Sequence, residues 1–201
     1  INVLIDLVNQ TEEDRILAHR SFSFDAHVKD MYAILTVGGS MHIMPSEIRK
    51  DLDLMFRFIE EHNITGGGYT TPIAALMLRR FPQMDVRFVA AGGEKLSNVY
   101  SDHIEIINEY GPTECTVDAT FYTIAPKRHL EEIPIGKTVA NCYTFIIDSY
   151  GRLAPHGVVG ELCFAGIQVA RGYWHLSELT DHFFEDCPFI SEDAWGRKVR
   201  M

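Results

Sequence analysis

The feature that most limits the fold of this chain is an alternation of short apolar segments and amphipathic segments up to about residue 112. Apolar runs such as 16–18 and 86–91 have the length of buried strands, and glycines or polar residues follow them. Between such runs lie segments whose apolar residues recur at helical spacing. This alternation is typical of a mostly parallel sheet with helices on its faces, which is the α/β class.

Two of the helical segments carry clear local signals. The first spans about 24–37 and ends at a glycine pair, and its apolar residues at helical spacing are Val28, Met31, Tyr32, Ile34 and Leu35. The second spans 47–61, and Ser46 before it is a suitable N-cap. A further helix is expected to begin at Thr71, because Pro72 fits the first turn of a helix.

The character of the chain changes after this region. Strand-like runs at 120–124, 144–148 and 160–164 are separated by turns rather than helices, and one short helix is expected near 176–184. This part is predicted to form a smaller antiparallel, β-rich and barrel-like subdomain. We place the boundary near residue 125, which divides the chain into 1–125 and 126–201.

Composition narrows the class of protein. The formal net charge is −10, so a nucleic-acid polyanion would be repelled and is not an expected partner. No apolar run approaches the length needed to span a bilayer, and no signal peptide opens the chain, so a cytoplasmic protein without a membrane partner is expected. The four cysteines are too widely spaced for a paired zinc site and are expected to be ordinary buried thiols.

A group of residues able to bind a nucleotide follows the apolar run 104–107. The stretch consists of Asn108, Glu109, Tyr110, Gly111, Pro112, Thr113 and Glu114. Gly-Pro after a strand makes a tight turn, and ligands of open α/β sheets collect at the carboxyl ends of strands. An aromatic ring there can stack on a base, a hydroxyl can reach a phosphate oxygen and a carboxylate can hold Mg²⁺. The alternative is a plain turn with a surface glutamate.

Two further stretches accompany this one. Residues 160–173 have the sequence Gly-Glu-Leu-Cys-Phe-Ala-Gly-Ile-Gln-Val-Ala-Arg-Gly-Tyr, and residues 24–26 are Phe-Asp-Ala. In this order, the three stretches resemble signatures of adenylate-forming enzymes, and 24–26 resembles the Phe-Asp-Ala-Ser element of the members that activate amino acids. The chain is therefore similar, over nearly its whole length, to the adenylation domains of nonribosomal peptide synthetases.

This resemblance implies a reaction and a set of nucleotide-binding residues. An α-amino acid and MgATP would give an aminoacyl-adenylate and pyrophosphate, and the acyl group would then pass to the phosphopantetheine thiol of a peptidyl carrier protein. Tyr110 is expected to stack on adenine and Asn108 to hydrogen-bond the adenine amino group. Thr113 is expected to contact the α-phosphate and Glu114 to ligate Mg²⁺, which makes them the expected catalytic residues. The expected nucleotide-binding residues are Gly92, Gly93, Asn108, Tyr110, Gly111 and Thr113.

The resemblance also implies an amino-acid pocket in the first part of the chain. Asp25 matches the residue that pairs with the substrate α-ammonium, although the same aspartate could also cap the following helix. The expected wall consists of Asp25, Ala26, Lys29, Gly68, Val89, Ala91, Glu109, Val117 and Asp118. Because Gly68 and the two alanines leave room, the substrate side chain need not be small.

Lys29 leaves three alternatives open, because an unpaired buried charge is costly. If Lys29 pairs with Glu109 or Asp118, the other carboxylate remains for a polar or cationic substrate side chain. If Lys29 faces the substrate, an acidic or amide side chain is favoured. In the third alternative, Lys29 points to solvent.

The ends of the chain suggest an internal piece of a longer polypeptide. The chain begins at Ile1 and stops within an apparent strand at 198–201. The resemblance places a phosphate loop before this piece, and a ribose-binding aspartate and a C-terminal domain with a catalytic lysine after it. We therefore expect the piece to be inactive alone and to need the remainder of the adenylation domain and synthetase as its partner.

Two other functions are compatible with these stretches. The chain could belong to a non-catalytic adenylation-like module that only binds or docks. It could also be part of an acyl- or aryl-CoA ligase, and Asp25 argues against this option because such substrates carry no α-ammonium group.

Overall fold

The computed structural model of the protein describes residues 1–190 and 197–200. The chain divides into two compact units. One consists of Ile1–Tyr110 and Phe121–Gly136, and the other of Gly111–Thr120 and Lys137–Met201. Residue 125 lies inside the second segment of the first unit, and the boundary placed there from the sequence stays a prediction.

The first unit is built on a mostly parallel sheet, as the alternation of segments predicts. Its strands follow the order β2-β1-β3-β4-β5-β6. The pairs β1–β2, β1–β3, β3–β4 and β4–β5 are all parallel. The strands are β1 (Arg15–Ala18), β2 (Ser40–Ile43), β3 (Gly66–Thr70), β4 (Phe88–Gly92), β5 (Glu105–Tyr110) and β6 (Thr120–Ile124).

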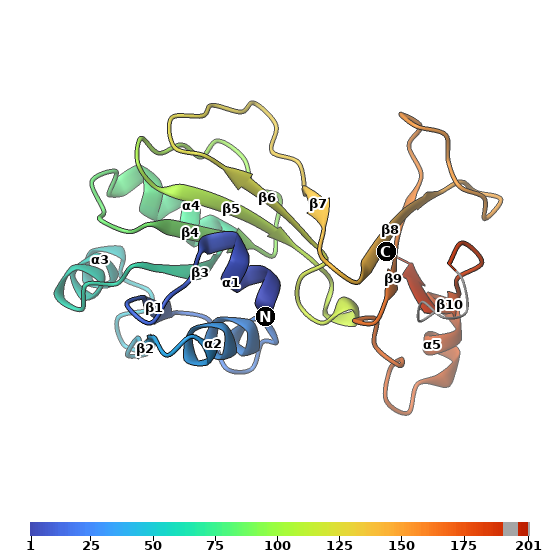
Figure 1. Ribbon diagram of the computed structural model, residues 1–201, viewed down its shortest axis with the longest axis horizontal. Coiled ribbons are helices and arrows are strands. Elements are labelled where there is room, and N and C mark those ends of the chain that lie inside the picture. The colour runs from blue at the N-terminus through green and yellow to red at the C-terminus, as the bar shows by residue number, and fades with distance from the viewer. Residues whose placement is uncertain (191–196, 201) are drawn as a thin grey trace. The chain divides into compact units, whose positions relative to one another are not determined.

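Helices cover both faces of this sheet (Figure 1). They are α1 (Asn2–Val8), α2 (Ala26–Thr36), α3 (Leu52–Glu61) and α4 (Thr71–Arg80). One hydrophobic cluster joins α1 and α2 to Phe88, Ala90 and Ile107 of the sheet. The other cluster joins α3 and α4 to the opposite face, where Val89 and Ala91 lie. Successive residues of β4 therefore face different helices, as the two-residue period of a strand requires.

The predicted start of the second helical segment is wrong. Helix α3 begins at Leu52 rather than at Glu47. Asp51 is the cap, because its Oδ1 accepts hydrogen bonds from the backbone N–H groups of Asp53 at 3.0 Å and Leu54 at 3.1 Å. A carboxylate that satisfies two free N–H groups is a strong start signal, whereas the Ser46 hydroxyl donates to its neighbour Glu47.

The buried face of α2 also differs from its apolar pattern. Val28, Tyr32 and Leu35 are exposed. The residues that turn inward are Lys29, Asp30, Ala33 and Ile34. Two charged side chains are thus buried on a helix that has apolar residues available. Charged side chains are rarely buried without partners, so these two are expected to pair with charges that face the helix.

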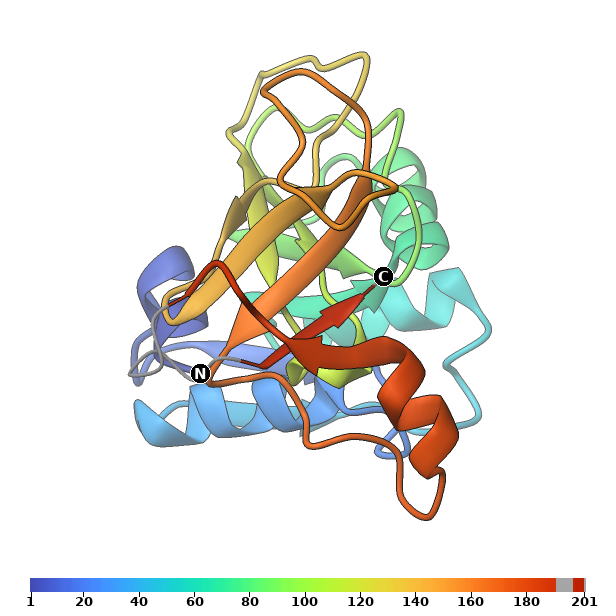
Figure 2. The same cartoon turned by 90° about the vertical axis from the view of Figure 1, so that its right-hand side faces the viewer.

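The second unit contains an antiparallel sheet with the strand order β10-β11-β9-β8, which confirms the predicted β-rich part. Figure 2 gives the clearest view of these strands, in orange and red, together with the red helix α5. The elements are β7 (Lys137–Thr138), β8 (Cys142–Ile147), β9 (Glu161–Gly166), α5 (Ser177–Phe183), β10 (Phe184–Asp186) and β11 (Arg197–Arg200). Met201, the end of the strand expected at 198–201, lies outside the described residues.

Two expectations from composition can be compared with the structure. All four cysteines are free and buried, as expected of ordinary thiols. Among the helices that the structure describes, none combines the length and apolarity needed to cross a bilayer.

Candidate functional site

Asp25 stands immediately before α2, and one of its carboxylate oxygens has no partner among the residues that the structure describes. Its Oδ2 is buried and accepts no hydrogen bond from any described residue. The backbone of Asp25 is helical (φ −58°, ψ −31°), and its side chain makes no capping bond. A capping residue normally has an extended backbone so that its side chain can reach the free N–H groups. The capping alternative is therefore not supported, and the oxygen is left for another donor.

A buried cluster of charges lies between α2, the end of β1 and the end of β5. Glu109 is at its centre: Oε2 accepts from Arg20 Nη2 at 2.7 Å, and Oε1 lies 2.7 Å from Lys29 Nζ. Arg20 Nη1 also lies 3.3 Å from both carboxylate oxygens of Asp30. The four side chains are only 3–9% exposed. Two cations and two carboxylates thus balance one another, as buried charges require.

The cluster fixes the ionisation of Glu109 more firmly than that of Asp30. Burial alone would raise the pKa of Glu109, but Lys29 and Arg20 outweigh that effect and hold the pKa at about 2. Burial raises the pKa of Asp30, and the same two cations offset only part of the rise. The pair of short contacts to Glu109 is therefore the stronger half of the cluster.

Arg20 takes the room that Gly68 leaves. A Cβ atom on Gly68 would lie 2.5 Å from Cζ of Arg20, so any larger residue at this position would displace the guanidinium group. The guanidinium group therefore occupies the volume expected to be left for a substrate side chain, and the assignment of Gly68 to the pocket wall stays a prediction. Sequence reasoning missed Arg20 and Asp30. Arg20 follows the end of β1 closely, and polar residues at the carboxyl ends of parallel strands could have pointed to it.

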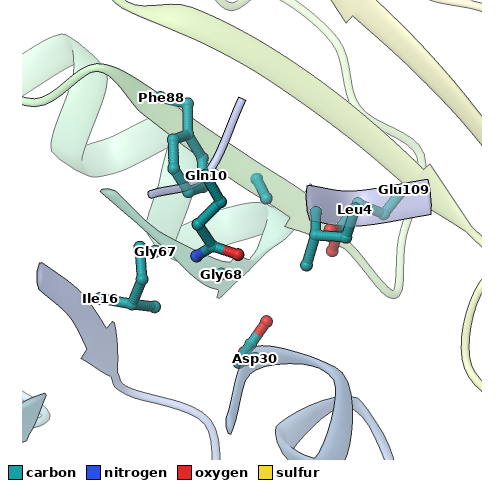
Figure 3. A pocket seen from close by; sticks show the side chains of 9 residues that line it. Leu4, Gln10, Ile16, Asp30, Gly67, Gly68, Phe88 and Glu109 are labelled. Carbon is teal, nitrogen blue, oxygen red and sulfur yellow. The ribbon is translucent and has the colours of Figure 1, made fainter. Parts of the chain in front are cut away.

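A small cavity of about 10 Å³ adjoins the cluster. Figure 3 shows the carboxylates of Asp30 and Glu109 and the amide of Gln10 around it. Gln10 Oε1 is buried and has no hydrogen-bond partner among the described residues. The volume suits about one water molecule and is too small for an amino-acid side chain.

Among the predicted wall residues of the first unit, the structure brings only some together. Lys29 and Glu109 form an ion pair, which is the first of the three alternatives for Lys29. The register places Gly68 beside Ala90, on the sheet face that carries this cluster. Val89 and Ala91 lie on the opposite face. Ala26 is in the first turn of α2, and Val117 and Asp118 belong to the second unit. Their assignment to a substrate pocket stays a prediction.

The predicted adenine-binding residues of the first unit lie at the carboxyl ends of β4 and β5. Asn108 is buried, and its Nδ2 donates to the backbone oxygen of Pro134 at 2.9 Å. This bond fixes the amide so that Oδ1 is the group left to accept a hydrogen bond.

A Cβ atom on Gly92 would lie 3.0 Å from the backbone oxygen of Glu109, and Gly93 has a φ of +100°. The backbone of Gly93 thus favours glycine, and a larger residue at Gly92 would be tightly packed against Glu109. Tyr110 is half-buried.

The rest of the same stretch forms a tight turn in the second unit. A Cβ atom on Gly111 would clash with the backbone oxygen of Val117, so this position needs glycine. Thr113–Cys115 forms one turn of 3₁₀-helix, in which Thr113 is exposed. The carboxylate of Glu114 accepts a hydrogen bond from the hydroxyl of Tyr173, and this bond raises the pKa of Tyr173 to about 12.

The turn is connected to the other signature stretch of the second unit by three more hydrogen bonds. The N–H of Ala170 donates to the backbone oxygen of Glu114 at 2.7 Å. The Thr116 hydroxyl donates to the backbone oxygen of Gln168 at 2.7 Å, and Gln168 Nε2 donates to that of Asp118 at 2.9 Å. The stretches around 111–118 and 168–173, far apart in sequence, therefore form one structural element.

The metal-binding capacity of the described residues is limited. None of their histidine, cysteine and acidic side chains gather in groups of three or more that could hold a metal ion. Glu114 would thus be a single protein ligand. This fits Mg²⁺ at a nucleotide, which is held by one or two carboxylates together with substrate phosphates and water.

Comparisons with known proteins agree with this arrangement of signatures. A family model described as "AMP-binding enzyme" matches residues 2–174. Bacitracin synthase 1 of Bacillus licheniformis is 37% identical over 94% of this chain, which spans 4% of that protein. Tyrocidine synthase 1 of Brevibacillus parabrevis is 35% identical over 93% of this chain, which spans 18% of it. The crystal structure of a four-domain nonribosomal peptide synthetase bound to AMP and glycine matches all of this chain with a TM-score of 0.88 at 27% identity, and this chain spans 15% of it.

Proposed function

Because this chain belongs to the AMP-binding enzyme family, we propose that it forms the amino-acid-selecting part of an adenylation domain in a nonribosomal peptide synthetase. The complete domain would convert an α-amino acid and MgATP into aminoacyl-AMP and pyrophosphate. The aminoacyl group would then be loaded onto the phosphopantetheine thiol of a peptidyl carrier protein. The matched synthetases, of which this chain spans only a small share, support this proposal.

The observation that carries the proposal is the unpartnered oxygen of Asp25. A buried carboxylate oxygen without a donor is destabilising, and proteins keep such a group where a ligand supplies the missing donor. The α-ammonium group of an amino acid is a cationic donor of suitable size. A substrate without an amino group would leave Asp25 unpaired, which disfavours fatty and aryl acids.

The nucleotide end of the site is supported by the kinds of group that lie at the carboxyl end of β5. Oδ1 of Asn108 suits the adenine amino group, and the half-buried ring of Tyr110 suits a stacked base. Glu114 would hold Mg²⁺ and Thr113 would contact the α-phosphate. Bound Mg²⁺ would neutralise charge on the phosphates during attack by the substrate carboxylate.

The test is amino-acid-dependent exchange of pyrophosphate into ATP, measured on the full-length protein with each common amino acid. Asp25→Ala should lower kcat/KM at least about 100-fold, because it removes the only charge that we assign to the α-ammonium group. Asp6→Asn is the matched control, since Asp6 is an exposed aspartate of α1. Full exchange by Asp25→Ala, or none by the unmodified protein with any amino acid, would contradict the proposal.

A further inference from the structure

We propose that Glu109, held by Arg20 and Lys29, stands in for a substrate carboxylate, so that the pocket rejects amino acids with acidic side chains. Arg20 thereby becomes a specificity-determining residue that none of the signature stretches contains. This inference rests on the proposed function, because it describes which amino acid the same site admits.

The first step of the argument is the geometry around Glu109. Each of its two oxygens has its own cation, at 2.7 Å from Arg20 Nη2 and 2.7 Å from Lys29 Nζ. Two donors that converge on one carboxylate are the arrangement with which proteins bind an acidic ligand. Here the acid is supplied by β5 of the protein itself.

The second step is the balance of charge. Arg20 also contacts Asp30, so the cluster contains two cations and two carboxylates whose side chains are at most 9% exposed. An acidic substrate side chain there would add a negative charge beside the carboxylates of Glu109 and Asp30. Burying an unpaired charge is strongly unfavourable, and a built-in like charge is an effective way to reject one class of ligand.

The third step is space. The guanidinium group of Arg20 fills the volume over Gly68, and the cavity beside the cluster has room for only about one water molecule. A substrate carboxylate that bound both cations as Glu109 does would have to take the position of the Glu109 carboxylate. Removal of that side chain should therefore convert rejection into acceptance.

The experiment compares glutamate with glutamine, and aspartate with asparagine, in the pyrophosphate-exchange assay on the full-length protein. These pairs match in size and differ in charge. We expect the unmodified protein to use neither acid better than the corresponding amide. In Glu109→Ala, the acid-to-amide ratio of kcat/KM should rise at least about tenfold for one of the pairs.

Two further variants separate charge from shape. Glu109→Asp keeps the negative charge and should continue to reject the acids. Asp53→Ala removes the carboxylate from an equally short but exposed ion pair with Arg80 and should leave the ratio unchanged. If Glu109→Asp accepts the acids as Glu109→Ala does, the inference is overturned.

A second measurement does not depend on activity. Sodium acetate should raise the thermal unfolding temperature of Glu109→Ala more than sodium chloride of equal ionic strength, because acetate can occupy the vacated position. The unmodified protein and Asp53→Ala should respond to both salts alike. The absence of this difference would overturn the inference, as would exchange in which the unmodified protein prefers glutamate or aspartate. Absence of exchange with every amino acid would instead overturn the proposed function, and this inference with it.

Discussion

Two glutamates of one signature stretch, Glu109 in the first unit and Glu114 in the second, are held by opposite kinds of partner. Glu109 is buried, and both of its oxygens contact cations. Glu114 is half-buried and accepts a hydrogen bond from the neutral hydroxyl of Tyr173. The first arrangement commits a carboxylate to the fold, since neither cation can be left alone in the interior. The second arrangement is compatible with the metal-ligand role that we propose for Glu114.

The largest effect is expected for Glu109→Gln, which removes the charge of the buried glutamate. The amide has the same shape but leaves Arg20 and Lys29 without the charge that they share, which costs about 3–5 kcal/mol when one partner of a buried pair is removed. We expect faster amide hydrogen exchange in β5 of the full-length protein, measured by mass spectrometry. Glu105→Gln on the same strand is the control. Burial already raises the pKa of Glu105, so loss of its charge should not accelerate exchange.

The effect of Glu109 on amide hydrogen exchange in β5 should depend on pH in a defined direction. The pKa of Glu109 is about 2 in the folded protein, below its ordinary value of 4.5. The charged form therefore contributes stability that is present above pH 4.5 and is lost as the pH falls toward 2. In acid, where Glu109 becomes protonated, the amide hydrogens of β5 should exchange equally fast in the unmodified protein and in Glu109→Gln. A difference between the unmodified protein and Glu109→Gln that stays constant down to pH 2 would contradict this assignment.

The same cluster shows what the sequence could predict. The alternation of segments correctly predicted the parallel sheet, because local periodicity reflects burial on the two faces. It failed for α2, where Lys29 and Asp30 are buried and Leu35 is exposed. The partners that bury those charges come from β1 and β5, and Arg20 and Glu109 are 89 positions apart. Such a pairing depends on the strand order, which local patterns do not contain.

The sequence names candidate residues more readily than it names their partners. It leaves Glu109 and Asp118 as alternative partners of Lys29, and the structure pairs Lys29 with Glu109. Asp25 was named as a ligand for an ammonium group, and its buried oxygen is unpartnered among the described residues. The contact between Glu114 and Tyr173 joins two signatures whose separate roles were predicted without it. A motif identifies a residue, whereas its partners require coordinates.

Asp14 has a buried carboxylate but a half-exposed cationic partner, so its loss should destabilise the protein less than the loss of Glu109. Asp14 accepts hydrogen bonds from Arg87 Nη2 at 2.7 Å and from the Thr65 hydroxyl at 2.7 Å. The Asp14 side chain is buried, but that of Arg87 is half-exposed. We expect Asp14→Asn to lower the free energy of opening of β3 by about 2 kcal/mol, measured by hydrogen exchange. Thr11→Ala, which keeps the backbone N–H that Asp14 also binds, is the control and should have a smaller effect.

The pH dependence at Asp14 follows from its partners. Burial alone would raise the pKa of Asp14, but the hydrogen bonds from Arg87 and Thr65 outweigh it and leave the pKa below its ordinary value of 3.8. Its contribution should therefore be present above pH 3.8 and be lost on acidification. Protection of β3 that increases as the pH falls below 3.8 would contradict this interpretation.

The Glu114–Tyr173 pair should be weaker and should respond to base rather than acid. The hydrogen bond to Glu114 raises the pKa of Tyr173 from 10.0 to about 12. Its contribution is therefore complete below pH 10 and is lost as the pH rises toward 12. Burial also raises the pKa of Tyr69, and a hydrogen bond to Asp102 raises that of Tyr100. An ultraviolet absorbance titration of Tyr173→Phe should therefore lose the phenolate signal near pH 12 and keep the late signals of Tyr69 and Tyr100. Exposure limits the stability lost in Tyr173→Phe to below about 1.5 kcal/mol. Removal of this signal by Tyr143→Phe instead would show that the assignment is wrong.

The smallest effect is expected for the ion pair between Asp53 and Arg80. Its contact distance equals those of the ion pairs at Glu109, but the pair is exposed. Arg80 Nη2 lies 2.7 Å from Asp53 Oδ2, and Nε also donates to Oδ1 at 3.1 Å. Both side chains are 55% exposed, so water replaces either partner and salt screens the attraction. Asp53→Asn should leave hydrogen exchange of α3 and α4 unchanged at physiological ionic strength. A loss comparable to that of Glu109→Gln would mean that distance, rather than burial, determines how much a carboxylate matters in this protein.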